Sequence, residues 1–205
     1  MEPSTFQLSP MCQLIVSLGD ITRWEGDAIV NAANELMLGG SGVDGAIHKA
    51  AGPKLLQACM QVPEVRRHVR CPVGEARITE AFCLRAKYVI HTAGPVYRRN
   101  LPVAKLLGDA YWHSLELGHA YGCKTIAFPA ISCGVYGYPL ESAAQTALET
   151  CLEFAEAAGE NAYDAIEFVL FNQATHDAWL AAASKLAMVT CDERGKSTCK
   201  KSLLM

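Results

Sequence analysis

The residues most able to do chemistry in this chain lie close together between positions 31 and 48. The segment reads NAANELMLGGSGVDGAIH and contains two asparagines, four glycines and one aspartate. Asparagine amides can donate and accept hydrogen bonds with sugar hydroxyls, and the carboxylate of Asp44 can act as a general base. Glycine loses more backbone entropy on folding than other residues, so four of them indicate a backbone that wraps closely around something. An ordinary surface loop is the alternative interpretation.

The elements around this segment follow the pattern of an α/β domain, in which short apolar runs alternate with helical patterns. Strands are predicted at residues 13–18, 28–31, 75–79, 88–92, 125–128 and 166–171. Helices are predicted at residues 43–51, 103–121, from about 139 to 158, and from about 175 to 187. Two of the strand runs do not alternate polar with apolar residues, which is typical of strands covered on both faces. A sheet with helices on both faces follows.

Two of the predicted strands lead into loops that can bind an anion through backbone N–H groups. The helix predicted at 43–51 follows glycines directly, so its free N–H groups point back into the loop. The strand at 125–128 leads into a second loop, PAISCGVYG at 129–137, which also precedes a helix. Ligands of open α/β sheets bind at the carboxyl ends of strands, so the two loops could hold the two phosphates of a pyrophosphate without a lysine.

Residues 40–45 match the dinucleotide fingerprint G-x-G-x-x-G, but their context does not indicate a dehydrogenase. That fingerprint follows its strand directly and needs an acidic residue about 20 positions later. Here eight residues separate Asn31 from the glycines, and Glu64 does not end a strand. The glycines therefore indicate a phosphate loop of another kind.

Each polar candidate also has a purely structural interpretation. Asp44 in a first helical turn interacts favourably with the helix dipole. Asn31 and Asn34 can form turns by bonding their own backbone. Asp20 can cap a turn or, if it faces a ligand, accept a hydrogen bond from an exocyclic amine such as that of adenine. A thiol-nucleophile role for Cys133 lacks a partner histidine at a recognisable spacing.

Composition narrows the class of protein. A chain of 205 residues fits one domain, and 51% hydrophobic residues argue against disorder. The net charge of −3 gives no basic field for nucleic acid, and no apolar run is as long as a membrane span. Nine scattered cysteines without a C-x-x-C pair indicate neither a disulfide framework nor a zinc site. With no secretory signal in view, a soluble protein of a reducing compartment is expected.

Taken together, these segments resemble the macrodomain family of ADP-ribose-binding modules and, within it, the MacroD-like branch. The resemblance covers about residues 12–187. It is carried by GDIT at 19–22, NAAN at 31–34, GGSGVDGAIH at 39–48, CPVG at 71–74, HTAGP at 91–95 and FPAISCGVYG at 128–137. It implies a three-layer α/β/α fold with a mixed, mostly parallel central sheet. Residues 1–11 are interpreted as an arm or an edge strand, and residues 188–205 as a flexible tail.

The resemblance also implies roles for individual residues. Asn34 would hold the distal ribose, Asp44 would position or deprotonate a water, and Tyr136 would press the ribose toward that water. Asp20 would take the adenine amine. The other implied ligand-binding residues are Ile21, Asn31, Gly40, Ser41, Gly42, Val43, Gly45, Ala46, Ser132, Cys133, Gly134, Val135, Gly137, Phe171 and Asn172.

The activity that the resemblance implies is hydrolysis. The expected substrates are mono-ADP-ribose on acidic side chains and O-acetyl-ADP-ribose. The alternatives are a non-catalytic ADP-ribose reader and a phosphatase of ADP-ribose 1″-phosphate. The expected partners are ADP-ribose, its derivatives and mono-ADP-ribosylated proteins, whereas nucleic acid, membrane, metal and cofactor are not expected. The expected location is the cytoplasm, with the nucleus as a further compartment.

Two positions depart from the family's usual pattern. Ser41 interrupts the glycine run, giving GGSG. A serine forced to a positive φ would be strained where a glycine is not, which would change the loop's geometry. Cys133 stands where relatives often have a threonine or a similar small residue, and it places an oxidisable atom near the expected phosphates.

Overall fold

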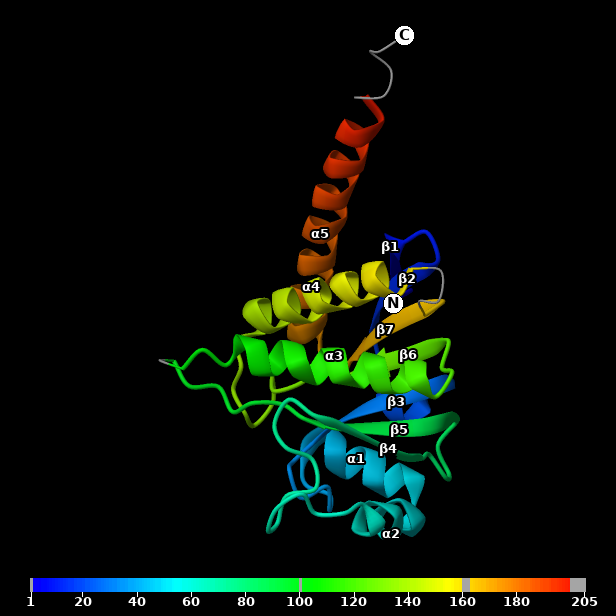
Figure 1. Cartoon of the computed structure of the whole chain (residues 1–205), viewed down its shortest axis with the longest axis vertical. Helices are drawn as coiled ribbons and strands as arrows, with labels where there is room; N and C mark the ends of the chain where they lie inside the picture. Colours follow the sequence, from blue (N-terminus) through cyan, green and yellow to red (C-terminus); the bar gives the residue numbers. More distant parts are fainter. Residues whose placement is uncertain (1, 100, 160–162, 200–205) are drawn as a thin grey trace.

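The computed structural model describes residues 2–99, 101–159 and 163–199 and shows an α/β fold (Figure 1). The elements are β1 (Ser4–Ser9), β2 (Cys12–Leu18), the 3-10 turn η1 (Ile21–Arg23), β3 (Gly26–Ala33), α1 (Gly42–Ala51), α2 (Pro53–Gln61), β4 (Ala76–Glu80), β5 (Ala86–Ala93), α3 (Ala104–Ala120), β6 (Thr125–Phe128), α4 (Leu140–Ala158), β7 (Ala165–Leu170) and α5 (Gln173–Cys199).

The strands form one mixed sheet in the order β1-β2-β7-β6-β3-β5-β4. The inner pairs are parallel, and the two outer pairs, β1 with β2 and β4 with β5, are antiparallel. Helices α3, α4 and α5 cover one face of the sheet, and α1 and α2 cover the other (Figure 1). The expected three-layer α/β/α architecture is therefore confirmed.

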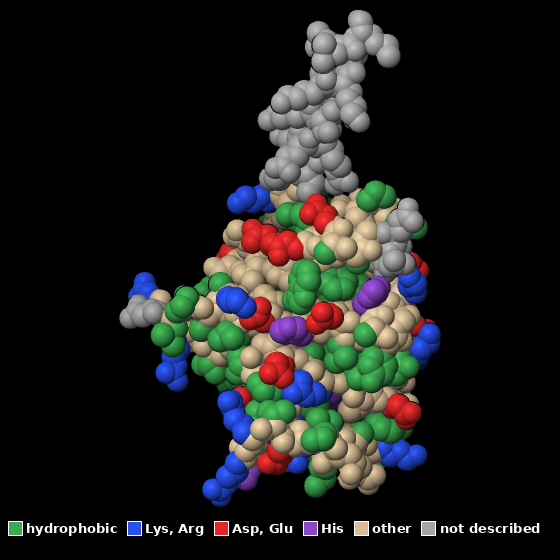
Figure 2. Space-filling model, in the orientation of Figure 1, with side chains coloured by type: hydrophobic (Ala, Val, Ile, Leu, Met, Phe, Trp, Pro, Cys, Tyr) green, Lys and Arg blue, Asp and Glu red, His purple; other side chains and the backbone are tan. Residues whose placement is uncertain are grey.

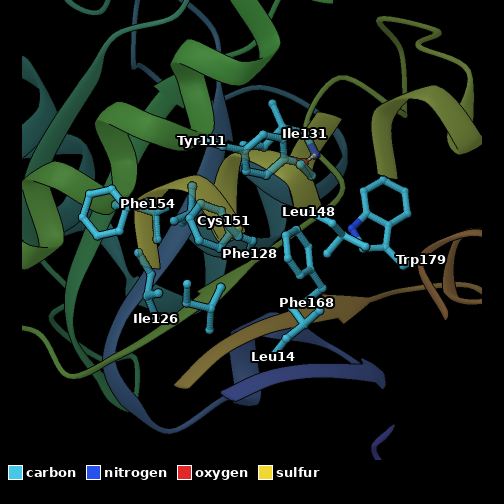
Figure 3. Close-up of a cluster of buried hydrophobic side chains, with 14 of the residues drawn as sticks. Leu14, Tyr111, Ile126, Phe128, Ile131, Leu148, Cys151, Phe154, Phe168 and Trp179 are labelled. Carbon is cyan, nitrogen blue, oxygen red and sulfur yellow. Dashed lines mark hydrogen bonds between the residues drawn. The ribbon is translucent and has the colours of Figure 1, made fainter. Parts of the chain in front are cut away.

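Each face of the sheet has its own hydrophobic core. The larger core, under α3, α4 and α5, contains Tyr111, Phe128, Phe168 and Trp179, all fully buried (Figure 3). Phe128 and Phe168 stack with their ring centroids 5.6 Å apart. The smaller core lies under α1 and α2 and includes Ile47. Because both faces are covered, the inner strand β3 is apolar over most of its length, as expected for a parallel strand.

All six strands predicted from the sequence are present, with small differences at their ends. The N-terminal segment, left open between an arm and an edge strand, forms β1 and pairs antiparallel with β2. Helix α2 is not among the predicted elements, although Pro53 at its first turn and the buried pair Leu55 and Cys59 are helix signals.

Helix α5 runs to Cys199, so the predicted helix end near Ala187 is wrong. The tail prediction for residues 188–205 falls partly outside the described residues, and its flexibility stays a prediction. Among the described residues no helix has the length and apolar character needed to cross a bilayer. On the face shown in Figure 2, acidic and basic side chains are interspersed.

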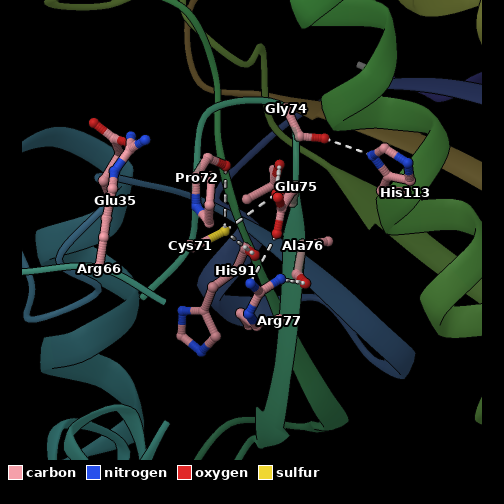
Figure 4. A network of polar contacts seen from close by, with 11 residues as sticks. Glu35, Arg66, Cys71, Pro72, Gly74, Glu75, Ala76, Arg77, His91 and His113 are labelled. Carbon is pink, nitrogen blue, oxygen red and sulfur yellow. Dashed lines mark hydrogen bonds and ion pairs between the residues drawn. The ribbon is translucent and has the colours of Figure 1, made fainter. Parts of the chain in front are cut away.

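The CPVG motif at residues 71–74 supports the sheet (Figure 4). Gly74 donates its N–H to the carbonyl of Ala93, which attaches the motif to the end of β5. His113 on α3 lies 2.6 Å from the carbonyl oxygen of Gly74, and the Cys71 thiol lies 3.1 Å from the carbonyl oxygen of Glu75. These contacts hold α3 and the loop before β4 against the sheet, so the motif has a structural role.

Candidate functional site

A cleft of two adjoining chambers lies at the carboxyl edge of the parallel strands. The larger chamber, about 470 Å³, is bordered by the exits of β2, β6 and β7 and by the start of α1. The smaller, about 310 Å³, is bordered by the exits of β3 and β5, the glycine loop and residues 130–136. Gly42, Val43, Ala130 and Gly134 line both chambers, so the two are continuous. Volumes of this size suit a small organic ligand.

Most of the site residues expected from the sequence line this cleft. The larger chamber contains Asp20, Ile21, Gly42, Val43, Ala46, Cys133, Gly134, Phe171 and Asn172. The smaller contains Asn34, Gly40, Ser41, Asp44, Ser132, Val135 and Tyr136. The start of α1 thus lies between an apolar chamber and one that carries the polar side chains of the glycine loop.

Three of the expected ligand-binding residues do not line the cleft. Asn31 is fully buried, because its side chain points inward to Asp44 and His91. Gly45 lies behind the loop, where a Cβ would come within 2.6 Å of the Gly40 carbonyl oxygen. Gly137 has φ +64° and lies in the turn that ends the second loop, where its N–H donates to the carbonyl of Gly134. In this structure these three residues support the loops, and the direct ligand contact expected for them stays a prediction.

The larger chamber offers a carboxylate and an exposed aromatic ring. Asp20 accepts hydrogen bonds at Oδ1 from the backbone N–H of Thr22 (3.0 Å) and from its hydroxyl (2.8 Å). The turn-capping interpretation of Asp20 is therefore confirmed, and the capped carboxylate lies at the chamber wall, where a hydrogen bond from a ligand amine stays a prediction. Phe171 is 82% exposed at the same chamber, where its ring can stack on a flat ligand.

The glycine loop places its unusual backbone angles on glycines. Gly39 has φ +84° and Gly42 has φ +63°. Ser41 has φ −106° and ψ 177°, which is ordinary extended backbone, so the strain considered for this serine does not arise. A Cβ on Gly40 would lie 2.9 Å from Oδ2 of Asp44 and 3.4 Å from Nδ2 of Asn34. Glycine is therefore required at position 40, because the Asp44 carboxylate lies too close to the place that a Cβ would take.

Asn34 stabilises the turn that begins this loop. Its Oδ1 accepts hydrogen bonds from the N–H groups of Leu36 (3.0 Å) and Met37 (3.1 Å), and its Nδ2 donates to the carbonyl of Gly39 (3.1 Å). The turn-forming interpretation thus holds for its oxygen. The amide nitrogen carries a second hydrogen, and Asn34 lines the smaller chamber, so a ligand hydroxyl there can accept from it.

Asp44 is a buried carboxylate at the wall of the smaller chamber, with 3% of its surface exposed. Its Oδ1 accepts a hydrogen bond of 2.7 Å from Nδ2 of Asn31 and lies 3.5 Å from Nε2 of His48. Its Oδ2 is buried and has no hydrogen-bond partner among the described residues. Burial raises the pKa of Asp44, and the hydrogen bond from Asn31 and the charge of His48 oppose that rise. A raised pKa brings a carboxylate closer to the range useful for a general base.

The second loop carries strain at Ser132, a non-glycine residue with φ +65°. Its Oγ is buried without a partner among the described residues, and a Cβ on Gly94 would lie 2.3 Å from it. Burial raises the pKa of the Cys133 thiol to about 12, so a nucleophilic role for this cysteine is not supported. Tyr136 lines the smaller chamber, and its carbonyl accepts a hydrogen bond from Tyr97 (2.9 Å).

Several cleft residues were not expected from the sequence. Four of them, Ala32, Ala33, Val169 and Leu170, are the last residues of β3 and β7, and the others are Gly19, Gly94, Pro129, Ala130 and Thr175. Gly19, Gly94, Pro129 and Ala130 lie within two residues of a strand end and belong to the GDIT, HTAGP and FPAISCGVYG motifs, so their position at strand exits is the signal that could have found them. Thr175 lies in the first turn of α5, and its place in the chamber depends on how the last helix packs.

His48, Cys59 and His91 place their ligand-type atoms within 4.8 Å of one another, beneath Asp44. Such a set suits a metal such as zinc only if the thiol loses its proton. Burial raises the pKa of Cys59 to about 11. The two ring nitrogens of His91 contact Asn31 (3.2 Å) and Thr79 (3.0 Å), so hydrogen bonds already hold this cluster together.

A family model described as Macro domain matches residues 30–147. The chain belongs to the macro domain family. It is 51% identical over 164 residues to a macro domain-containing protein of Xanthomonas campestris, covering 78% of this chain and 89% of that protein. It is 58% identical over 137 residues to the O-acetyl-ADP-ribose deacetylase of Citrobacter rodentium, covering 66% and 76% of the two chains. A mutant Oceanobacillus iheyensis macrodomain with ADPR superimposes with a TM-score of 0.83 at 37% identity, covering 90% and 98%.

Proposed function

We propose that this macro domain is a hydrolase of ADP-ribose esters. It binds ADP-ribose in the cleft, deacetylates O-acetyl-ADP-ribose, and removes mono-ADP-ribose from acidic side chains of proteins. Relatives named O-acetyl-ADP-ribose deacetylase and a structural neighbour with ADPR support the ligand class. Both substrates contain the same bond, a carboxylic ester to a ribose hydroxyl, so one site can serve both.

The two chambers fit the two ends of such a ligand. Adenine would occupy the larger chamber, with its exocyclic amine toward Asp20 and its face on Phe171. The diphosphate would lie across the start of α1, whose free N–H groups and helix dipole favour an anion. The distal ribose would then enter the smaller chamber beside Asn34 and Asp44.

The observation that carries the catalytic proposal is the buried and unpartnered Oδ2 of Asp44. A buried carboxylate oxygen without a donor is energetically costly, so its retention points to a water or substrate group that supplies the missing hydrogen bond. A water bound there would give its proton to Oδ2 while its oxygen attacks the ester carbonyl. The acyl–oxygen bond then breaks, and the ribose oxygen takes up a proton to leave as a hydroxyl.

Replacing the base tests this proposal directly. Asp44→Asn keeps the shape of the side chain and its contact with Asn31 but removes the proton acceptor. We expect turnover of O-acetyl-ADP-ribose and of a glutamate-linked ADP-ribosylated protein to fall about 10²–10⁴-fold. The Kd of ADP-ribose, measured by calorimetry, is expected to change less than about tenfold. Asp109→Asn removes a carboxylate on α3 that does not line the cleft, and it serves as the control.

Other outcomes identify the other functions. A wild-type protein that binds ADP-ribose but releases no product would be a reader. Release of phosphate from ADP-ribose 1″-phosphate, with no cleavage of either ester, would indicate the phosphatase. Equal losses of binding and turnover in Asp44→Asn would contradict the role of Asp44 as base.

A further inference from the structure

We infer that His91 is a positioning residue that holds the Asn31 amide in the one orientation that donates to Asp44. This inference rests on the proposed role of Asp44 as base. His91 has no exposed surface and lines neither chamber, so it acts only through its neighbours. Asn31 and His91 are partners in the parallel register of β3 and β5, which brings their side chains together beneath the cleft.

The Asn31 amide nitrogen lies between two acceptors. Nδ2 of Asn31 is 2.7 Å from Oδ1 of Asp44 and 3.2 Å from Nδ1 of His91. An NH₂ group has two hydrogens, one for each acceptor. If the amide were rotated by half a turn, its oxygen would face a carboxylate oxygen and a ring nitrogen lone pair. That arrangement is repulsive, so Asp44 and His91 together fix the amide.

This arrangement requires one tautomer of His91. Nδ1 must carry the lone pair, so the ring proton is on Nε2. Nε2 is 3.0 Å from Oγ1 of Thr79 and 3.7 Å from Sγ of Cys59, and either atom can accept its proton. Burial and the charge of His48 lower the pKa of His91 to about 3, so the ring stays neutral through the working pH range. A neutral ring keeps Nδ1 available as an acceptor.

Through Asn31, His91 affects the pKa of the Asp44 carboxylate. The groups that face Asp44 are Asn31 from β3, His48 from α1 and, behind them, His91 and Cys59. Arg70 adds a positive charge near Cys59. Among these groups only Asn31 makes a close hydrogen bond to the carboxylate. If the Asn31 amide lost its fixed orientation, its hydrogen bond would stabilise the charged carboxylate less, and the pKa of Asp44 would rise.

Two substitutions of His91 distinguish the role of Nδ1 from the role of Nε2. In His91→Asn the side-chain oxygen falls near the position of Nδ1 and can still accept from Asn31. In His91→Gln the amide reaches the position of Nε2, opposite Thr79, and leaves the Asn31 side empty. Both variants are polar and smaller than or similar in size to histidine. A purely structural role would make the two variants equally harmful, whereas the positioning role predicts different results.

The first measurement is the pKa of the Asp44 carboxyl group, followed through the ¹³C chemical shift of its carboxyl carbon. This readout does not depend on turnover. We expect His91→Gln to raise this pKa by about one unit, and His91→Asn to leave it within a few tenths. The acid limb of the pH–rate profile should move to higher pH by the same amount in His91→Gln only. The Kd of ADP-ribose should change less than about twofold in both variants. Equal shifts in both, or none in His91→Gln, would overturn the inference.

A second measurement covers the case in which a variant fails to fold. The ¹⁵N shifts of His91 in the wild-type protein report its tautomer directly. We expect a bare Nδ1 and a protonated Nε2, with no titration between about pH 5 and 9. A protonated Nδ1 would overturn the inference. A wild-type protein without esterase activity that still shows the expected Asp44 shift in His91→Gln would contradict the proposed function and leave the positioning role intact.

Discussion

At the scale of single residues, the proposed mechanism needs an ionised Asp44 carboxylate, and burial in the fold disfavours that charge. Asp44 is buried, and one of its oxygens has no partner among the described residues. The pKa of Asp44 is raised from the ordinary value of 3.8 because burial penalises the charged form. The unfolded chain holds the same carboxylate in water at no such cost. Ionisation of Asp44 therefore reduces the stability of the fold at the pH where the proposed role as a base requires the charged carboxylate.

This cost predicts that Asp44→Asn is more stable than the wild-type protein at pH 7. The stability penalty from ionised Asp44 is absent below the pKa of this residue in the unfolded chain. It grows as the pH rises and is complete above the higher pKa of Asp44 in the folded protein. Thermal unfolding should give a higher Tm for the variant at pH 7, by about 2–4 °C for each kcal/mol relieved. The difference should vanish near pH 3, where both states are protonated. A lower Tm of the variant at pH 7 would contradict this account.

The pairing of Asn31 with His91 shows which part of the site could not be predicted. The sequence shows both residues at the ends of apolar runs. Their contact spans 60 residues of chain and depends on the register of two parallel strands. The family resemblance therefore implied a ligand contact for Asn31, and His91 entered the sequence analysis only as part of the HTAGP motif. By contrast, Asp20 and Asn34 lie within short local turns, whose residue types can be recognised from sequence.

At the scale of elements, the loop between β3 and α1 sets the backbone turns that position the polar side chains of the site. Gly39 and Gly42 take the positive φ angles, and Gly40 gives space to Asn34 and Asp44. The sequence predicted a close-fitting glycine loop but not these separate roles. The number of glycines does not reveal which of them takes a positive φ and which leaves space for neighbouring side chains. Helix α2 was missed because it is short and follows α1 after a single glycine, with no change in composition.

A methyl group at position 40 should disturb catalysis more than binding. In Gly40→Ala the new Cβ would lie 2.9 Å from Oδ2 of Asp44, which is closer than real contacts allow, so the carboxylate or the loop must shift. We expect esterase turnover to fall at least about tenfold, because small displacements of a base are costly. Gly108→Ala on α3, which meets only ordinary contacts, is the matched control. Unchanged turnover in Gly40→Ala would show that Oδ2 is not at the reaction centre.

The start of α5 gives a separate prediction about stability. Asn172 accepts hydrogen bonds at Oδ1 from the N–H of Thr175 (2.9 Å) and from its hydroxyl (3.0 Å), as a helix N-cap does. Asn172→Ala should cost about 1 kcal/mol of unfolding free energy. Asn172→Asp retains the acceptor and adds a favourable charge at the helix start, so its stability should match the wild type. Urea unfolding distinguishes the two, and equal losses would contradict the capping role.

At the scale of the whole molecule, the cleft is assembled from the exits of β2, β3, β5, β6 and β7. The general position of this cleft was predictable, since parallel strands bring their carboxyl ends to one edge. Its division into two chambers was not, because the division depends on how α1 and the second loop pack against each other. A ligand that reaches both chambers therefore ties together segments that are distant in sequence.

Such a ligand should stabilise the whole fold. At a concentration of 100 Kd, ADP-ribose should add about 2.7 kcal/mol to the unfolding free energy, which corresponds to a Tm increase of about 5–11 °C for a domain of this size. AMP, which would reach only the larger chamber, should bind more weakly. Gly40→Ala should reduce the effect of ADP-ribose but leave that of AMP unchanged. An equal effect of the substitution on both ligands would contradict the assignment of the distal ribose to the smaller chamber.

The unpartnered oxygen of Asp44 also has a consequence for inhibitor design. A compound anchored on Phe171 in the larger chamber gains apolar contact area but leaves this oxygen unsatisfied. Extending it into the smaller chamber with a single N–H donor directs that donor toward the Asp44 carboxylate, and glycine at position 40 leaves the space beside Oδ2 free of a side chain. Selectivity would then come from the length and angle of the linker between the two chambers, which the start of α1 sets.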